Sequence, residues 1–396
     1  MFCANCGTQL AGDEKFCAAC GHQVTALPQQ STQQTAYQQQ VMYQQMMAQQ
    51  MMQGQGYPPY MWPRPQSKGK LATFIDNVNR MTGGTEHVEL KMNDLVESVF
   101  RQHTKQEAEE IFIYGTAATT PPERYISTAW PHPWLYSRVF LVLAITMACL
   151  LFMTETLGNK LAAPGVIFIG ALAVPFSALI FFFEVNAPRN ISIFETTQVF
   201  FIGGVMSLVM TMFVYGFIGF DKLSNTSTFL VGFAEEVGKL IVTAYFLRGV
   251  EKKYILNGLL IGAAVGAGFA VFETAGYIAK TNSLGVLYLR AALALGGHVA
   301  WGSLTGAALA MVKGAEPLRA DHFLDFRFLK FLLVCIVLHG LWDMPLLSHI
   351  LPLLTQIGLM VLVWIFVLVM LHAGLRQIST QQAQAQQTVP QGSASI

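Results

Sequence analysis

The residues in this chain that could carry out chemistry are ionisable side chains placed inside strongly apolar segments. They form four groups along the sequence, which are Glu235, Glu236 and Lys239, then Glu273, then His298, then His339 with Asp343. A charge inside the hydrocarbon of a membrane is costly, so each of these residues is a candidate for function. Two histidines and several glutamates in one poorly solvated pocket would suit the hydrolysis of a peptide bond.

Two mechanisms fit this set of residues. A divalent metal held by His298 and His339 can activate water. Alternatively, a glutamate can act as general base on water while the histidines stabilise the oxyanion. The spacing leaves both mechanisms open, and it also leaves open whether Glu235 or Glu236 is the base. The chain has no HExxH helix, so it is not a standard zinc protease of that type, and it has no GxSxG motif and no Ser–Lys dyad that stands out.

Helical spacing assigns supporting roles to the remaining charged residues. Glu235 and Lys239 are four residues apart, as are His339 and Asp343, so the members of each pair share a helix face. We therefore expect Asp343 to orient the His339 ring and Lys239 to neutralise part of the glutamate charge. Glu235 and Glu236 point about 100° apart on a helix, which predicts that they face different neighbours.

The elements that must position these residues are membrane-spanning helices. The chain has 396 residues, of which 53% are hydrophobic and only 12% charged, and the apolar residues are concentrated after Arg138. A span needs about 20 mostly apolar residues. This predicts an all-α polytopic bundle of about eight spans, at residues 138–157, 163–183, 197–220, 228–248, 255–279, 288–312, 328–347 and 351–373.

The charges between these spans predict how the bundle is oriented. Most lysines and arginines fall in connections on one side, which the positive-inside rule makes cytosolic, so both termini are expected in the cytosol of a cell-membrane protein. Counting about 1.5 Å per residue from each span end places the charged groups of the four helices at a similar depth, in the outer half of the bilayer. The sequence thus predicts that they converge.

A separate metal site is predicted at the N-terminus. Cys3, Cys6, Cys17 and Cys20 form two CxxC pairs, each followed by glycine, and four thiolates can hold one tetrahedral Zn²⁺. This pattern indicates a small zinc ribbon that needs its metal to fold. With a complete set of four cysteines, His22 is not needed as a ligand.

The rest of the chain divides by composition. The predicted units are a zinc ribbon (1–25), a disordered Gln/Pro-rich linker (26–69), a cytosolic and partly helical region (70–136), the membrane domain (137–376) and a disordered tail (377–396). Two amphipathic helices are expected near residues 90–100 and 105–114. The net charge of +1 gives no argument for nucleic-acid binding, and the ribbon contains only Lys15 as a fixed positive charge.

The four charged groups, in their order, resemble the motifs of the PrsW family of membrane proteases. They are EExxK (Glu235, Glu236, Lys239), FxxxE (Phe269, Glu273), HxxxG (His298, Gly302) and HxxxD (His339, Asp343). That family is related to the CAAX prenyl endopeptidase and bacteriocin-immunity superfamily, which shows EExxxR, FxxxH and HxxxN/D. Glu273 stands where prenyl endopeptidases carry histidine, which fits PrsW and leaves two histidines as metal ligands. The resemblance covers roughly residues 138–375.

The resemblance implies an intramembrane endopeptidase that cleaves membrane-tethered substrates, such as anti-sigma-factor-like regulators, on their extracytoplasmic side. Its implied site comprises Glu235, Glu236, Glu273, His298, His339 and Asp343, with a divalent metal on His298 and His339. Two other functions stay open on the residues alone. One is an ion or proton transporter that uses the buried Glu/His cluster. The other is a membrane sensor or adaptor whose zinc ribbon recruits a cytosolic protein.

Overall fold

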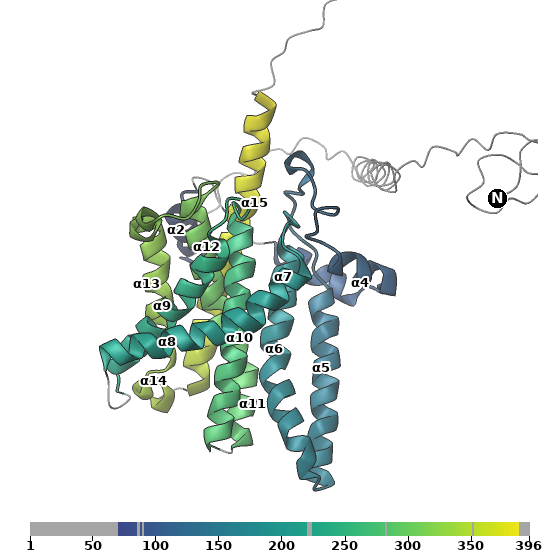
Figure 1. Cartoon of the computed structure of the whole chain (residues 1–396), viewed down its shortest axis with the longest axis vertical. Coiled ribbons are helices and arrows are strands. Elements are labelled where there is room, and N and C mark those ends of the chain that lie inside the picture. The colour runs from purple at the N-terminus through teal and green to yellow at the C-terminus, as the bar shows by residue number, and fades with distance from the viewer. Residues whose placement is uncertain are drawn as a thin grey trace, which may run out of the picture. The chain divides into compact units, whose positions relative to one another are not determined.

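The described part of the chain is built from helices. The computed structural model describes residues 70–84, 88, 91–219, 224–281, 283–350 and 352–387, and no strand occurs among them (Figure 1). The four cysteines of the predicted zinc ribbon, the Gln/Pro-rich linker and residues 388–396 lie outside these ranges. The predicted all-α class is confirmed.

Six helical stretches of the described residues are long and apolar enough to cross a membrane. In chain order they are α5 (Leu135–Leu151) with η3 (Phe152–Thr156), η4 (Lys160–Ala162) with α6 (Ala163–Val185), α7 (Ile193–Gln198) through η5 (Val199–Gly203) to α8 (Gly204–Ile218), α10 (Ile255–Thr281), α11 (Leu284–Leu293) through η6 (Ala294–Gly296) to α12 (His298–Lys313), and α15 (Pro352–Gln387). The chain is thus a multi-pass membrane protein.

The other two predicted spans also form helices, but they differ from the six in composition or length. They are α9 (Ser227–Leu247) and α13 (Phe326–Trp342). Helix α9 carries Glu235, Glu236 and Lys239, which lower its apolar character, and α13 has only 17 residues. Both are shielded by neighbouring helices, since α9 packs against α8, α10, α12 and α13. The count of six candidate spans therefore reflects length and composition only. All eight predicted spans are helical in the part of the chain that the structure describes.

Helices α10 and α12 form the centre of the bundle. Every residue of α10 from Ile255 to Val271 is buried, as is every residue of α12 from His298 to Ala310. A Cβ atom added at Gly258, Gly262 or Gly266 of α10 would collide with the backbone carbonyl of Gly306, Gly302 or His298 respectively. This seam of small residues lets the two backbones touch, as is common between membrane helices.

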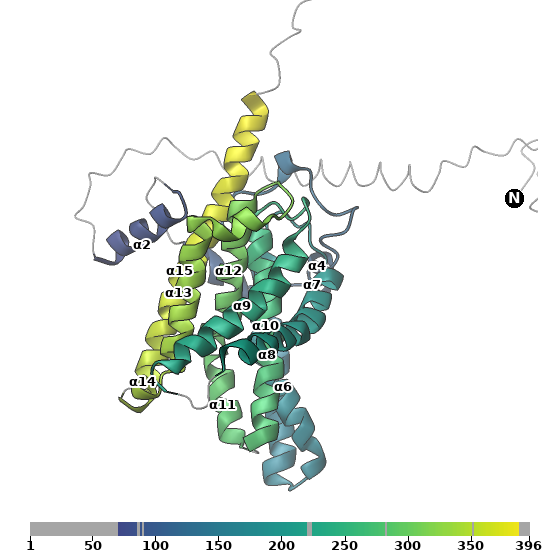
Figure 2. The same cartoon turned by 60° about the vertical axis from the view of Figure 1, so that its left-hand side comes forward.

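Helices α8 and α9 pack beside α10, and α8 crosses it at a steep angle (Figures 1 and 2). The crossing is close because Gly204 of α8 lies against the backbone of Gly268 of α10. Helix α13 packs on both α9 and α12, and α10 packs on the same two helices, so the four helices that carry the charged groups form one cluster.

The sixth predicted span is broken in its middle. The sequence indicates one continuous helix over residues 288–312, but α11 ends at Leu293 and α12 begins at His298, with η6 and Gly297 between them. Gly297 adopts φ −103°, ψ −138°, far from helical values. Paired glycines at 296 and 297 lower the cost of this break. As a result, His298 is the first residue of a helix that starts inside the protein.

Among the described residues, three short α-helices precede the first span, and the start of that span is capped by a side chain of the second. The two expected amphipathic helices are found as α3 (Met92–Glu97, continued by η1, Ser98–Phe100) and α4 (Lys105–Phe112), preceded by α2 (Lys70–Met81). The carboxylate of Glu184 accepts hydrogen bonds from the backbone N–H groups of Trp134, Leu135 and Tyr136 at 2.8–2.9 Å. These are the N–H groups that a helix start leaves without partners, so α6 caps α5.

The C-terminal helix is longer than predicted. Residues 377–387 were expected in a disordered tail, but they continue α15. The Gln382 side chain donates hydrogen bonds to the carbonyls of Glu123 and Ile126, and Ile378 is fully buried. Glutamine and alanine are good helix formers, so these tertiary contacts suffice to extend the helix.

Candidate active site

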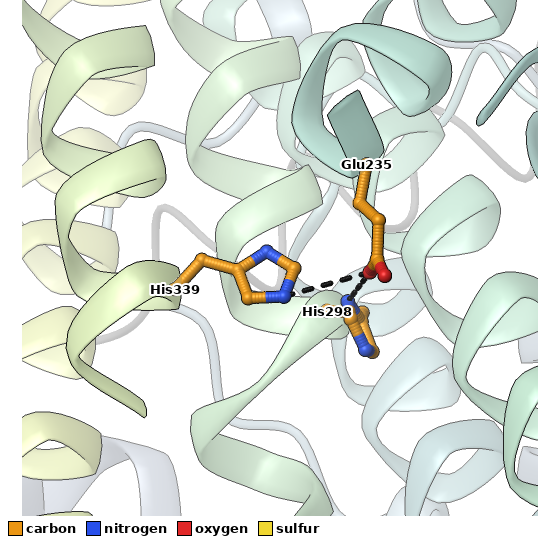
Figure 3. A group of neighbouring side chains, drawn as sticks. All are labelled: Glu235, His298 and His339. Atoms are coloured by element: carbon orange, nitrogen blue, oxygen red, sulfur yellow. Dashed lines mark ion pairs between the residues drawn. The ribbon is translucent and has the colours of Figure 1, made fainter. Parts of the chain in front are cut away.

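Three of the predicted residues meet at one point in the bundle. Glu235 of α9, His298 of α12 and His339 of α13 are all buried, and one donor atom from each lies within 4.8 Å of the others. Glu235 Oε2 is 3.5 Å from His339 Nε2 and 4.0 Å from His298 Nδ1 (Figure 3). The convergence predicted from span depth is therefore present.

Packing fixes the two histidine rings. Trp301, one turn after His298, stacks on the His339 ring with centroids 4.3 Å apart, and the two imidazoles meet edge to face at 5.2 Å. Gly232 brings α9 against α13, since a Cβ there would lie 2.9 Å from the Ile336 carbonyl. These contacts leave each ring little freedom to turn.

Each histidine ring is also held by a glutamate, which contacts the ring nitrogen that points away from Glu235. His339 Nδ1 is 2.8 Å from Glu236 Oε1, and His298 Nε2 is 3.0 Å from Glu273 Oε2. The opposite nitrogen of each ring faces Glu235. A carboxylate behind a histidine is the usual way to fix its tautomer and to raise its basicity as a ligand.

Lys239 neutralises the centre of the cluster, as expected. Its ammonium lies 2.7 Å from Glu236 Oε1 and 2.8 Å from His298 Nδ1, and the residue is 1% exposed. An ammonium can only donate, so His298 Nδ1 accepts and its ring proton sits on Nε2, donated to Glu273. The lysine therefore sets the tautomer of His298.

Two side chains in the site are absent from the predicted set. Arg290 of α11 pairs with Glu273 and donates from Nε to Thr274 Oγ1 at 2.9 Å. Tyr215 of α8 donates its hydroxyl to Glu235 Oε1 at 2.9 Å. Each of the two is a polar residue within an apolar segment, which could have drawn attention to it. Neither has a charged residue three or four positions away, as members of the first and last of the four groups do.

Asp343 lies at the edge of the cluster. Its Oδ2 is 3.4 Å from His339 Nε2, the nitrogen that faces Glu235, whereas Glu236 holds Nδ1 at 2.8 Å. The closer carboxylate on the ring is thus Glu236. The orienting role expected of Asp343 remains a prediction.

Comparison with known families agrees with this geometry. Residues 191–371 match the PrsW family intramembrane metalloprotease model, and that range includes every residue of the cluster. The chain carries a PrsW-family intramembrane metalloprotease domain. Residues 2–24 match a zinc-ribbon domain, as the cysteine spacing predicted. No curated protein and no solved structure matches the chain. The protein is therefore a membrane peptidase with an N-terminal zinc-ribbon domain.

The cluster of the PrsW domain opens into a cleft of about 730 Å³. Its lining includes Glu235, Glu273, His298, His339 and Asp343, together with residues of α6, α8, α10, α11 and α15. Glu236 and Lys239 are not in the lining. The volume is typical of a ligand pocket. Only part of the cluster therefore faces the cleft, while Glu236 and Lys239 support it from behind.

The residues of the PrsW domain fit a divalent metal. Glu235 Oε2 is buried and has no hydrogen-bond partner among the described residues, although it lies between two histidine nitrogens. Two histidines are ligands typical of catalytic zinc sites, and a glutamate beside them can either complete the ligand set or act as base on the bound water. The Lys239 ammonium on His298 Nδ1 is the one group that would have to move for this nitrogen to act as ligand.

Proposed function

We propose that the PrsW domain is an endopeptidase that cleaves membrane-tethered proteins at the cluster of Glu235, His298 and His339. The observation that carries this proposal is that Glu235, unlike the adjacent Glu236, lines the cleft beside the two histidines. The Oε2 atom of Glu235 is buried, has no hydrogen-bond partner among the described residues and stands 3.5 Å from His339 Nε2. A buried carboxylate oxygen left without a donor is costly unless function requires it.

Glu235 is the proposed general base. Glu236, the alternative left open by the sequence, also has a buried Oε2 without a hydrogen-bond partner among the described residues, but Lys239 and His339 engage its Oε1 and the residue does not line the cleft. Of the two adjacent glutamates, Glu235 is therefore the one that can present a carboxylate oxygen to a water molecule in the cleft. It would take the proton of the attacking water and later deliver it to the leaving amine.

His298 and His339 are proposed to hold the divalent metal implied by the family. When bound, such a metal supplies a Lewis acid that activates water and polarises the scissile carbonyl. Glu273 and Glu236 keep the two rings oriented through the nitrogens that point away from Glu235. Because both rings are buried, these two carboxylates, and not solvent, hold the rings in place.

The proposed substrate is the extracytoplasmic end of a membrane-anchored protein, for example a regulator of the anti-sigma-factor type. The cleft is enclosed by membrane-spanning helices, so a substrate must reach it from within or beside the bilayer. The predicted orientation places the cluster in the outer half of the membrane. This supports cleavage near the outer surface and not in the cytosol.

The proposal is tested by replacing Glu235 with glutamine. Glu235→Gln keeps the shape and the Tyr215 contact but removes the base, so we expect cleavage of a co-expressed single-span reporter to fall by about 100-fold or more. His339→Ala should have a similar effect. The matched control is Glu155→Gln, because Glu155 is an exposed carboxylate at the end of a span. Normal cleavage by Glu235→Gln, with normal insertion, would exclude this site.

A further inference from the structure

We infer that Tyr215 is a positioning residue for Glu235, which it holds so that one carboxylate oxygen faces the two histidines. This inference rests on the proposed function of Glu235 as base. Tyr215 lies outside the four groups that the sequence singles out, on a different helix from any of them. The argument is built on the two oxygens of Glu235, on the contact between α8 and α9, and on the cleft.

The two oxygens of Glu235 have different surroundings. Oε1 accepts a hydrogen bond from the Tyr215 hydroxyl at 2.9 Å. Oε2 has no hydrogen-bond partner among the described residues and points between His298 and His339. A carboxylate on a long unbranched side chain can rotate about three bonds, so one anchored oxygen fixes where the other lies. Tyr215 thereby selects the oxygen that is offered to water.

The contact between α8 and α9 sets the register that makes this bond. A Cβ atom at Gly238 of α9 would collide with Thr211 of α8, so the two helices touch at this point. Tyr215 lies one turn after Thr211, and Glu235 lies one turn before Gly238. Because the connection between α8 and α9 is short, the two helices run in opposite directions. One turn forward along α8 and one turn back along α9 therefore lead from the contact point in the same direction. The close contact at Gly238 therefore brings the hydroxyl within reach of the carboxylate.

Tyr215 and Glu235 both line the cleft. The tyrosine is half-buried, whereas the next aromatic on α8, Phe217, is 78% exposed. A tyrosine that served only packing would not need its hydroxyl aimed at a buried carboxylate, since the phenyl ring supplies the apolar area. The hydroxyl is thus the functional part of the residue, and its removal should act through Glu235.

The test is Tyr215→Phe in the full-length protein in detergent, with the purified single-span reporter as substrate. Loss of a partner that orients a site residue typically costs about 10-fold to 100-fold in activity. We expect kcat to fall by that factor while KM stays within about twofold, because the ring and the shape of the cleft are kept. The matched control is Tyr245→Phe on α9, a tyrosine that is 58% exposed and lies beside Arg248, which follows the last residue of α9.

The outcomes separate the two proposals. A drop in kcat for Tyr215→Phe alone, with an unchanged thermal unfolding midpoint, supports positioning. Unchanged kcat, a change in KM only, or an equal drop for Tyr245→Phe overturns it. Full activity of Glu235→Gln in the same assay would instead refute the proposed function, whatever the tyrosine variant does.

Discussion

Lys239 is the residue on which the charge balance of the site depends. Its ammonium contacts Glu236 and His298, and it lies over the Phe269 ring with 4.7 Å to the centroid. Breaking a buried ion pair by removing one partner leaves the other charge uncompensated in a poorly solvated place. The lysine therefore supports Glu236, and through Glu236 it supports the orientation of His339.

We predict that Lys239→Met destabilises the protein by about 3–5 kcal/mol, because Glu236 is left buried without its cation. Thermal or denaturant unfolding in detergent would measure the loss. The double variant Glu236→Gln with Lys239→Met should recover most of it, since both charges are then gone.

The control for this prediction is Lys105→Met. Lys105 also pairs with a glutamate, Glu109 at 3.2 Å, but both side chains are exposed, so little change in stability is expected. A loss from Lys239→Met no larger than that from Lys105→Met would contradict the role of the buried pair.

The contact between α10 and α12 is the element that places His298. The seam of Gly258, Gly262 and Gly266 brings α10 onto the backbone of α12, and the last of these glycines lies against the His298 carbonyl itself. Wider separation of the two helices would move His298 away from Glu273 of α10. The glycines thus connect helix packing to the geometry of the site.

We predict opposite effects for two glycine-to-alanine changes on α10. Gly262→Ala forces a methyl group into the Gly302 backbone and should cost about 1–3 kcal/mol through overpacking. Gly276→Ala meets nothing within 4 Å and should stabilise the helix by up to about 1 kcal/mol. Unfolding in detergent measures both changes. Equal stability of the two variants would show that the seam is not tightly packed in the membrane.

The whole molecule carries two candidate metal sites of different chemistry in one chain. The zinc-ribbon match covers residues 2–24 and rests on four cysteines, whereas the membrane cluster offers two histidines and a carboxylate. Thiolate sites of this kind are structural and closed, while a site of two histidines and a carboxylate leaves a position for water. The two sites should therefore bind metal independently.

We predict about two equivalents of zinc in the purified full-length protein. Replacing Cys3 and Cys6 by serine should remove one equivalent, and replacing His298 and His339 by alanine should remove the other. Elemental analysis of the detergent-solubilised variants measures this. If zinc disappears entirely with the ribbon cysteines, the membrane site holds no tightly bound zinc and Glu235 must activate water alone.

The residue types and their order can be read from the sequence, and their depth in the membrane is predicted from it. A charge within an apolar span stands out because lipid cannot solvate it, so Glu235, Glu273, His298 and His339 were identified before any contact was known. The family resemblance and the zinc ribbon followed from motif spacing and were confirmed. Helix positions could also be predicted, because apolar runs of the right length have few alternatives in a membrane.

Only the tertiary structure decided which atoms face each other. The partners of the two histidine rings come from different helices, and their distances depend on close glycine contacts between helices that no spacing rule contains. The break before His298 and the Tyr215 bond are of the same kind, because each depends on how a neighbouring helix packs. Residues 377–387 are helical for this reason too, since the Gln382 side chain donates to the carbonyls of Glu123 and Ile126. Local sequence fixes where a helix can form, but packing between helices fixes which side chains meet.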